Sequence, residues 1–277
     1  MARFKVTIAY DGSGFHGFQR QAGKDLRTVQ GVLEDRLTKL LDAPIIVHAA
    51  GRTDAGVHAK GQVFHFDTAR NISAEGLIYA FNRYLPADIT ANEVVQAAPG
   101  FHARKLACGK CYGYHLYTGR RLPAIGHMYL AHEIRPVDEA VFSKVLAQAE
   151  GTHYFAGFCG RGASTLTYDR TLYRVRVFRA GDYWAIYLIG DGFLRKMVRN
   201  LVGTALDEAA GRKPAGTFAR ALASGKREEG GNTAPAEGLF LERVYYDQEN
   251  LARGLDRLDA GRPEDLVGPR AIFTDLF

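Results

Sequence analysis

The sequence has 277 residues, of which 47% are hydrophobic and 24% charged, the balance of a globular protein long enough for two packed units. Its apolar runs are too short to cross a bilayer and three cysteines cannot build a disulfide framework, so we expect a cytoplasmic protein without a membrane span. The formal net charge of +6 favours a polyanionic partner such as a nucleic acid.

The first hundred residues alternate between strand and helix patterns. Apolar side chains alternate with polar ones over residues 4–10, which predicts a half-buried strand, and recur at helical spacing over residues 28–41. The same reasoning predicts strands over 45–50, 62–66 and 89–96, and a helix that Ser73 opens and Pro86 stops. This order, β-α-β-β-α-β, is that of a ferredoxin-like unit.

The second half repeats this order approximately. We expect an extended segment over 103–117, a helix over 138–150, a hairpin of 172–178 with 183–189, a helix over 193–211 and a strand over 239–246, with long loops over 151–170 and 211–236. The sequence therefore predicts an α+β fold in which two ferredoxin-like units join into one mostly antiparallel sheet with a central cleft.

The expected boundaries follow from this repeat. Residues 1–102 form the N-terminal unit and residues 103–247 the C-terminal unit. Residues 248–277 carry four Lys and Arg against six Asp and Glu, and we interpret them as a separate acidic C-terminal extension.

Gly12, Gly14 and Gly17 spell the dinucleotide fingerprint G-x-G-x-x-G directly after the first strand. The fingerprint requires a helix that opens within the glycines, whereas helical periodicity begins only near Thr28. An oxidoreductase that binds nicotinamide or flavin is therefore disfavoured. A surface hairpin, or an RNA-contacting loop that presents Arg20 to phosphates, fits the segment better.

Cys108 and Cys111 form a C-x-x-C pair that raises the possibility of a metal site. Positions three apart on an extended strand point to opposite faces, so the two sulfurs should diverge. The sequence has no second cysteine pair, and His102 and His115 are poorly spaced to complete a tetrahedral site. We interpret both cysteines as small strand residues and expect no metal.

The segment GRTDAGVHAKG, residues 51–61, lies between two expected strands and contains three glycines around Asp54. Its simplest interpretation is a structural turn with a surface Arg52 and Asp54. Glycines also allow a ligand or another backbone to approach closely, and a carboxylate there is able to serve as a nucleophile or base beside a cation. The residues alone leave both interpretations open.

GRTDAGVHAKGQV, residues 51–63, closely resembles the signature of the tRNA pseudouridine synthase A family. Further blocks resemble that family in the same order along residues 3–247: YDGSGFHGFQRQ at 10–21, TVQGVLE at 28–34, FNRYLPADI at 81–89, FHAR at 101–104, GDGFLRKMVRN at 190–200 and TAPAEGLFL at 233–241.

The resemblance implies the pseudouridine synthase fold and an isomerase that converts uridine to pseudouridine at positions 38, 39 and 40 in the anticodon arm of tRNA. It implies no metal or organic cofactor and a homodimer in which tRNA contacts both subunits. Because a paired uridine cannot expose its glycosidic carbon, such an enzyme has to flip the base out of the helix.

The resemblance also implies roles for five residues. Asp54 is the catalytic nucleophile, and Tyr112 stacks on the target uracil. Arg199 pairs with Asp54, Arg52 occupies the space that the flipped uridine leaves, and Leu239 lines the pocket. A core aromatic on a strand is the structural alternative for Tyr112, and a solvated helix face is the alternative for Arg199.

A non-catalytic RNA-binding protein is the main rival, because β-α-β-β-α-β units also build RNA-recognition modules. Those modules carry stacking aromatics in a strand of the form K/R-G-F/Y-G/A-F-V-x-F/Y. No stretch of this sequence fits that pattern, so the enzyme is the preferred hypothesis.

Overall fold

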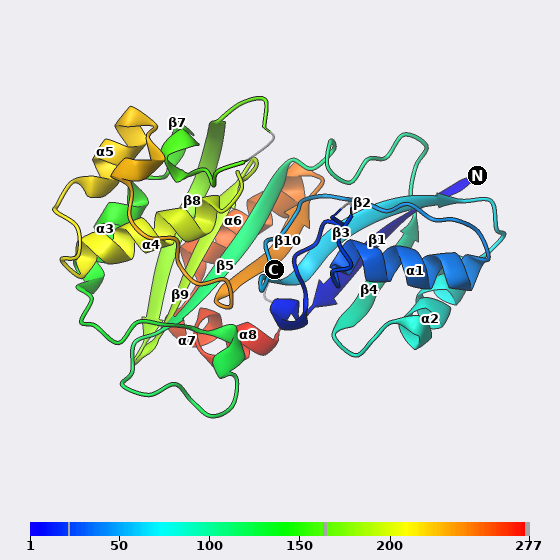
Figure 1. The fold of residues 1–277 in the computed structure, drawn as a ribbon, viewed down its shortest axis with the longest axis horizontal. Helices are drawn as coiled ribbons and strands as arrows, with labels where there is room; N and C mark the ends of the chain where they lie inside the picture. The colour runs from blue at the N-terminus through cyan, green and yellow to red at the C-terminus, as the bar shows by residue number, and fades with distance from the viewer. Residues whose placement is uncertain (22, 163–164, 275–277) are drawn as a thin grey trace. The chain divides into compact units, whose positions relative to one another are not determined.

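The computed structural model describes residues 1–21, 23–162 and 165–274 (Figure 1). The chain forms two compact units. Unit 1 comprises Met1–Cys108 and Phe240–Asp247, and unit 2 comprises Gly109–Leu239 and Gln248–Phe277. The chain therefore enters unit 2 twice, whereas the sequence-based division placed its boundaries at residues 102 and 247.

The sheet of unit 1 is built around β1, Ala2–Tyr10, which pairs antiparallel with β3, His58–Thr68, and with β4, Ile89–Gln96. The short β2, His48–Ala49, pairs antiparallel with β3. The resulting order β4-β1-β3-β2 follows from the β-α-β-β-α-β sequence and confirms the ferredoxin-like prediction for this unit. In β10, Leu239–Tyr245, the residues from Phe240 onward run parallel to β3 and bring the end of the chain's last strand into unit 1.

Both helices of unit 1 begin at the capping residues that the sequence indicates. The Thr28 hydroxyl accepts a hydrogen bond from the Gly31 amide at 3.2 Å and opens α1, Val29–Leu41. The Ser73 hydroxyl accepts one from the Gly76 amide at 3.1 Å and opens α2, Ala74–Tyr84. The two helices lie side by side (Figure 1), and Leu33, Leu37 and Leu41 of α1 and Leu77 of α2 are buried in the core of the unit.

The sheet of unit 2 has the order β5-β9-β8-β7, with antiparallel neighbours, and a short β6 runs parallel to β5. The strand bounds are β5 Gly109–Tyr117, β6 Ala131–His132, β7 Gly151–Tyr154, β8 Asp169–Ala180 and β9 Tyr183–Gly190. The predicted hairpin of β8 and β9 is therefore confirmed. The α-helices described in unit 2 are α3 Glu139–Ala147, α4 Met197–Ala209, α5 Thr217–Ser224, α6 Gln248–Ala260, α7 Pro263–Leu266 and α8 Pro269–Phe273.

The central strand β9 is buried on both faces. On one face Trp184 packs edge-on against Phe142 of α3, with ring centroids 5.6 Å apart. On the other face the Tyr187 hydroxyl donates to the Leu266 carbonyl of α7 at 3.0 Å, and Asp259 of α6 binds Arg174 of β8 at 2.9 Å. Figure 1 shows α4 and α6 on opposite faces of this sheet. The C-terminal segment is therefore part of unit 2 rather than a separate appendage.

Several predicted elements begin later than their periodicity indicates. The strand expected over 45–50 is reduced to β2, because the Ile45 and Val47 amides donate to Thr38 and Glu34 of α1 instead of to a neighbouring strand. The helix expected from residue 193 starts at Met197, after Lys196 with a left-handed φ of 59°. The extended segment expected from residue 103 becomes a strand only at β5.

The two long loops expected in the second half contain regular structure. Residues 151–170 hold β7 and a short helix, η3, at Phe155–Phe158. Residues 211–236 hold α5 and a second short helix, η4, at Arg227–Glu229. Two more short helices lie at Gly12–Gly14 (η1) and His127–Tyr129 (η2). Over the described residues, no helix combines the length and the apolar character that crossing a membrane requires.

A cluster of three histidine rings in unit 1 predicts a pH dependence of stability. The His65 ring lies 5.0 Å from His48 and 4.8 Å from His102, and its Nδ1 accepts a hydrogen bond from the Ala103 amide at 3.2 Å. Burial, aided by the charges of the neighbouring rings, lowers the pKa of His65 to about 4. In the unfolded chain His65 has its ordinary pKa of about 6.5. Between about pH 6.5 and pH 4 it therefore binds a proton in the unfolded chain that it does not bind in the folded protein.

We expect the free energy of unfolding to be undiminished above about pH 6.5 and to fall as the pH drops from there toward about 4. Urea titrations across this range measure the effect. The variant His65→Asn retains a hydrogen-bond acceptor but cannot titrate, so its stability should depend less on pH over the same interval. An identical pH profile in both proteins would remove His65 as the cause.

Candidate active site

The Asp54 loop, residues 50–57, connects β2 with β3 in unit 1. Within it Thr53 is buried, Asp54 is half-buried and Arg52 is exposed. The Val57 amide donates to the Asp54 carbonyl at 3.2 Å, which closes a turn, and Gly56 adopts the left-handed φ of 77° that this turn requires. The sequence thus presents one carboxylate on a short, tightly turned connector.

The first loop of the chain, residues 11–18, holds the Asp54 loop through its backbone. The Phe18 amide donates to the Thr53 carbonyl at 3.1 Å, and the Gly56 amide donates to the Phe15 carbonyl at 3.3 Å. Gly17 has a left-handed φ of 89°, and a Cβ there would lie 2.9 Å from the Thr53 carbonyl oxygen.

The glycines of G-x-G-x-x-G therefore allow a close approach between two loops. A Cβ on Gly12 would collide with the backbone of Val57, whereas one on Gly14 would meet only side-chain ends, the nearer being the Arg27 guanidinium at 3.0 Å. The segment forms the short helix η1, and the first α-helix begins only at Val29. The interpretation as a nucleotide-binding fingerprint is thus disfavoured by the geometry that the fingerprint needs.

Buried side chains anchor the Asp54 loop from below. The Tyr10 hydroxyl and the Thr53 hydroxyl lie 2.8 Å apart, and the Gln62 amide donates to the Gly51 carbonyl at 2.9 Å. Burial raises the pKa of Tyr10 to about 12, so the phenol stays protonated and available for this hydrogen bond. The anchors fix the residues on either side of Asp54.

Tyr10→Phe is expected to lower the free energy of unfolding by about 1 kcal/mol, because it removes a buried hydrogen bond while the ring still fills the core. It should also reduce the activity that depends on Asp54, since Thr53 loses its anchor. Chemical denaturation and initial rates measure both effects. Tyr79→Phe, which removes an exposed hydroxyl on α2, is the matched control and should change neither.

Tyr112 lies on β5 in unit 2 and is 7% exposed. Its ring packs edge-on against Phe193, with centroids 4.8 Å apart. Tyr114 lies two residues further along β5 on the same face of the strand. Its hydroxyl donates to the Pro235 carbonyl at 3.0 Å. Burial raises the pKa of Tyr114 well above its usual range, so this phenol remains a donor.

Arg199 and Leu239 are linked through the segment 234–239. Arg199, on the first turn of α4, donates from Nε to the Ala234 carbonyl at 2.7 Å, and its own carbonyl accepts from the Ala234 amide at 3.0 Å. Leu239, which is buried, closes the segment by donating its amide to the Ala236 carbonyl at 2.9 Å. Because Tyr114 binds Pro235, the segment also lies against the Tyr112 face of β5.

The structure thus places the predicted site residues in two groups. Arg52 and Asp54 belong to unit 1, and Tyr112, Arg199 and Leu239 belong to unit 2. The pairing of Arg199 with Asp54 stays a prediction. The sequence did not predict the anchor between Tyr10 and Thr53, although Tyr10 ends an alternating strand on its buried face, directly before the first loop.

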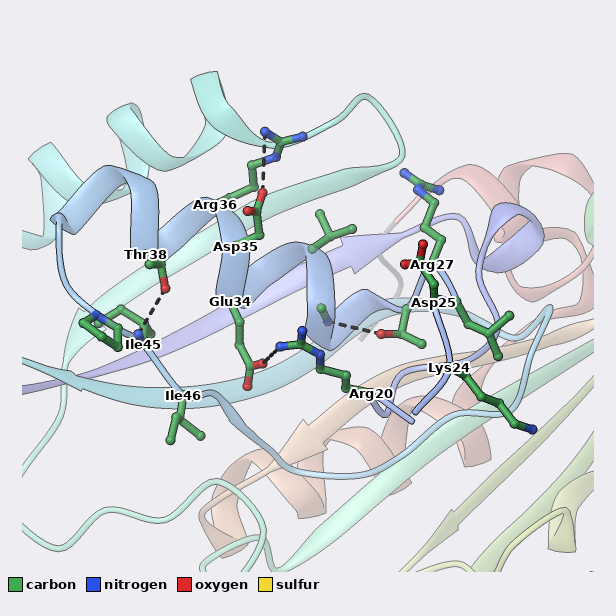
Figure 2. A pocket seen from close by; sticks show the side chains of 15 residues that line it. Arg20, Lys24, Asp25, Arg27, Glu34, Asp35, Arg36, Thr38, Ile45 and Ile46 are labelled. Carbon is green, nitrogen blue, oxygen red and sulfur yellow. Dashed lines mark hydrogen bonds and ion pairs between the residues drawn. The ribbon is translucent and has the colours of Figure 1, made fainter. Parts of the chain in front are cut away.

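A groove of about 610 Å³ runs along α1 in unit 1, and Figure 2 shows the side chains that line it. None of the predicted site residues is among them. Its charges are largely paired: Arg20 lies 3.7 Å from Glu34, and Arg36 lies 3.8 Å from Asp35. The groove therefore offers little net charge to an anionic ligand, and Arg20 already has a carboxylate partner.

The cysteines and histidines do not converge on a metal centre. Cys108 is half-buried and precedes β5, whereas Cys111 is buried within it, and neither forms a disulfide. In the part of the chain that the structure describes, no group of three His, Cys, Asp or Glu side chains is arranged to hold a metal ion.

Comparison with known proteins identifies the family. The model of the family described as tRNA pseudouridine synthase matches residues 6–104 and 145–247, more than half of the chain. The tRNA pseudouridine synthase A of Geobacillus kaustophilus (strain HTA426) is 41% identical over 254 residues, which cover 91% of this chain and 98% of the relative. That of Ligilactobacillus salivarius (strain UCC118) is 38% identical over 252 residues, which cover 90% and 98%.

The chain belongs to the tRNA pseudouridine synthase family. This confirms the resemblance that the sequence blocks indicate, and it confirms an enzyme family over the non-catalytic alternative. It also confirms the α+β fold class, while the joining of the two sheets around a central cleft stays a prediction. A solved Cbf5-Nop10-Gar1 complex matches with 10% identity and a TM-score of 0.36, over 95% of this chain and 69% of that one, a similarity too low to support an argument.

Proposed function

We propose that this pseudouridine synthase family member isomerises uridine to pseudouridine at positions 38, 39 and 40 in the anticodon stem-loop of tRNA. The observation that carries the proposal is Asp54 in the GRTDAGVHAKGQV loop, held by backbone hydrogen bonds from the first loop and by the buried contact of Tyr10 with Thr53. This arrangement offers a carboxylate with a defined position, as nucleophilic catalysis needs.

The reaction exchanges one bond of the nucleoside for another. The bond from uracil N1 to ribose C1′ breaks, the ring turns, and C5 bonds to C1′ while the C5 proton leaves and N1 gains one. Three routes use a carboxylate: attack of Asp54 on C1′, attack on uracil C6, or assistance through a glycal-like intermediate. In the first route the carboxylate attacks the sugar carbon, as the nucleophile of a retaining glycosidase does.

Access to the glycosidic bond requires that the uridine leave its stem, at a cost of about a few kcal/mol in lost stacking and pairing. We propose that Tyr112 stacks on the extruded uracil and that Leu239 lines the same pocket. Arg52, whose side chain is exposed, then occupies the space that the base leaves. Together these contacts offset the cost of extrusion.

Arg199 is proposed to pair with Asp54. The net charge of +6 supplies attraction to phosphates that depends on salt and not on base sequence, so the shape of the tRNA selects the position. We further propose a homodimer in the cytoplasm whose two subunits both contact tRNA, working without metal or organic cofactor.

The proposal is tested with unmodified tRNA transcripts incubated with the purified protein and mapped chemically for pseudouridine. Signals are expected at positions 38, 39 and 40 wherever a uridine stands there, and replacement of that uridine by cytidine should remove each signal. A protein that binds the transcripts without forming pseudouridine would instead support the non-catalytic alternative. Pseudouridine found only outside the anticodon stem-loop would refute the proposed position.

A further inference from the structure

A hollow of about 420 Å³ lies on unit 2, and none of the predicted site residues lines it. It is lined by the end of β7, by the segments around η3 and η4 and by the turn that follows α5. Its lining side chains are basic and aromatic, with one thiol and one carboxylate: Tyr154, Cys159, Arg161, Tyr168, Lys226, Arg227 and Glu228. The proposed reaction gives none of these residues a role.

The cations at this hollow lack acidic partners, whereas several other arginines of the unit have them. Arg135, Arg174, Arg176, Arg179 and Arg212 each form an ion pair. Within the described ranges, the cations at the hollow and beside it form none: Arg161, Arg195, Lys196, Lys226 and Arg227. Positive charge is therefore concentrated there.

The guanidinium groups of Arg161 and Arg227 in the hollow repel each other. Arg227 is half-buried and donates only to neutral oxygens, those of Asn200 at 3.1 Å and Thr233 at 3.3 Å. Burial and the nearby charge of Arg161 both lower the pKa of Arg227. A bound anion would relieve this repulsion, and Glu228 is the single carboxylate among the described residues that line the hollow.

The backbone around the hollow holds the cations in place. The Arg195 guanidinium donates to the Arg161 carbonyl at 3.0 Å, and the Gly160 amide donates to the Arg195 carbonyl at 2.7 Å. The neighbouring Lys196 adopts a left-handed φ of 59°, a strained conformation for a residue with a side chain. Such strain is typical of ligand-binding segments.

The aromatic wall provides a surface for a planar ligand. Tyr154 is 52% exposed although its ring packs edge-on against Tyr168, with centroids 5.6 Å apart. Gly225, with a φ of 67°, leaves room for this ring, because a Cβ there would lie 2.9 Å from it. An exposed, held tyrosine beside guanidinium groups is the combination that binds unpaired nucleotides, with the base on the ring and the phosphate on the cations.

We propose that this hollow is a second RNA-binding site, which takes an unpaired nucleotide of the tRNA outside the reaction centre. The phosphate lies between Arg161 and Arg227, and the base stacks on Tyr154. Lys226 and Arg195 add attraction to the flanking phosphates. The proposal rests on tRNA as the substrate in the proposed function, and it extends the contact with tRNA beyond the nucleotide that is modified.

The double variant Arg161→Ala/Lys226→Ala tests the site through filter binding of full-length tRNA. We expect the Kd to rise about tenfold and the dependence of log K on log salt to become shallower by about two, because two phosphate contacts are lost. Lys144→Ala/Lys213→Ala removes the same charge from exposed residues that do not line the hollow, and its Kd should stay within about twofold of wild type.

Substitutions at Tyr154 distinguish the contribution of base stacking to tRNA binding from that of charge. Tyr154→Ala should weaken binding about fivefold or more, whereas Tyr154→Phe should bind like wild type, because only the ring is needed. Thermal melting of each variant checks that the fold is retained. A double variant that matches the lysine control in Kd and in salt dependence would overturn the inference. Binding is measured without turnover, so a wild type that binds tRNA but forms no pseudouridine would refute the proposed function alone.

Discussion

Asp54→Ala is expected to lower the rate of pseudouridine formation by at least about a thousandfold while tRNA binding largely survives. Without its nucleophile the protein retains only the contacts that hold the RNA, and loss of a catalytic nucleophile commonly costs this much or more. The fold should persist, because the hydrogen bond from the Val57 amide goes to the backbone carbonyl of residue 54. Single-turnover rates at saturating protein, with tRNA binding measured in parallel, separate the two effects.

Asp54→Asn sharpens this test because it preserves the shape of the side chain and removes only the charge. It should be as inactive as Asp54→Ala. Asp25→Ala, which removes an exposed carboxylate from the same unit, is the control for net charge and should leave the rate unchanged. An Asp54→Asn protein as active as wild type would eliminate the carboxylate from the mechanism.

Gly12→Ala is expected to lower the free energy of unfolding by about 3 kcal/mol, because a methyl group there would collide with the backbone of Val57 and neither main chain can yield without loss of hydrogen bonds. Activity should fall as well, since the displaced segment carries Asp54. Urea denaturation and initial rates at a temperature where the variant is folded measure the two consequences.

Gly14→Ala is the matched control for this substitution. It lies in the same short helix, and its added methyl would meet side-chain ends only, the nearer being the guanidinium of Arg27 at 3.0 Å, which is able to move. We expect a change within about 0.5 kcal/mol. Equal destabilisation by both variants would show that the approach of the two loops is not the reason for glycine at position 12.

The elements that the sequence predicted well are those whose signals are local. Thr28 and Ser73 cap their helices with their own side chains, and the alternation over residues 4–10 reports the burial of β1 directly. The β8–β9 hairpin follows from the same two-residue period. Such patterns depend on neighbours within a few positions, so they can be interpreted without knowledge of the fold.

The elements that were missed depend on distant partners. Residues 45–47 have strand composition, yet Glu34 and Thr38 of α1 take the amides of Val47 and Ile45. The C-terminal segment was interpreted by its charge, although Leu251 and Leu258, both buried in the structure, stand seven apart at helical spacing. Composition masked that signal, and the sheet face that the segment covers could not be known in advance.

The candidate site shows the same division. Asp54 was identified through its sequence block, but the reason for the glycines at 12 and 17 was not, because their contacts with Val57 and Thr53 join positions about forty residues apart. The pattern G-x-G-x-x-G has the form of a dinucleotide fingerprint, which its sequence context already disfavours, and in this fold it permits contact between two loops. A motif thus predicts chemistry only when its structural context is present.

A structure of the Asp54→Asn protein bound to an unmodified tRNA tests most directly whether this carboxylate meets an extruded uridine. We predict a target uridine turned out of the anticodon stem, its C1′ within about 3.5 Å of the residue 54 side chain and its uracil stacked on Tyr112. A uridine still stacked within the stem, with residue 54 remote from every nucleotide, would contradict the proposed mechanism.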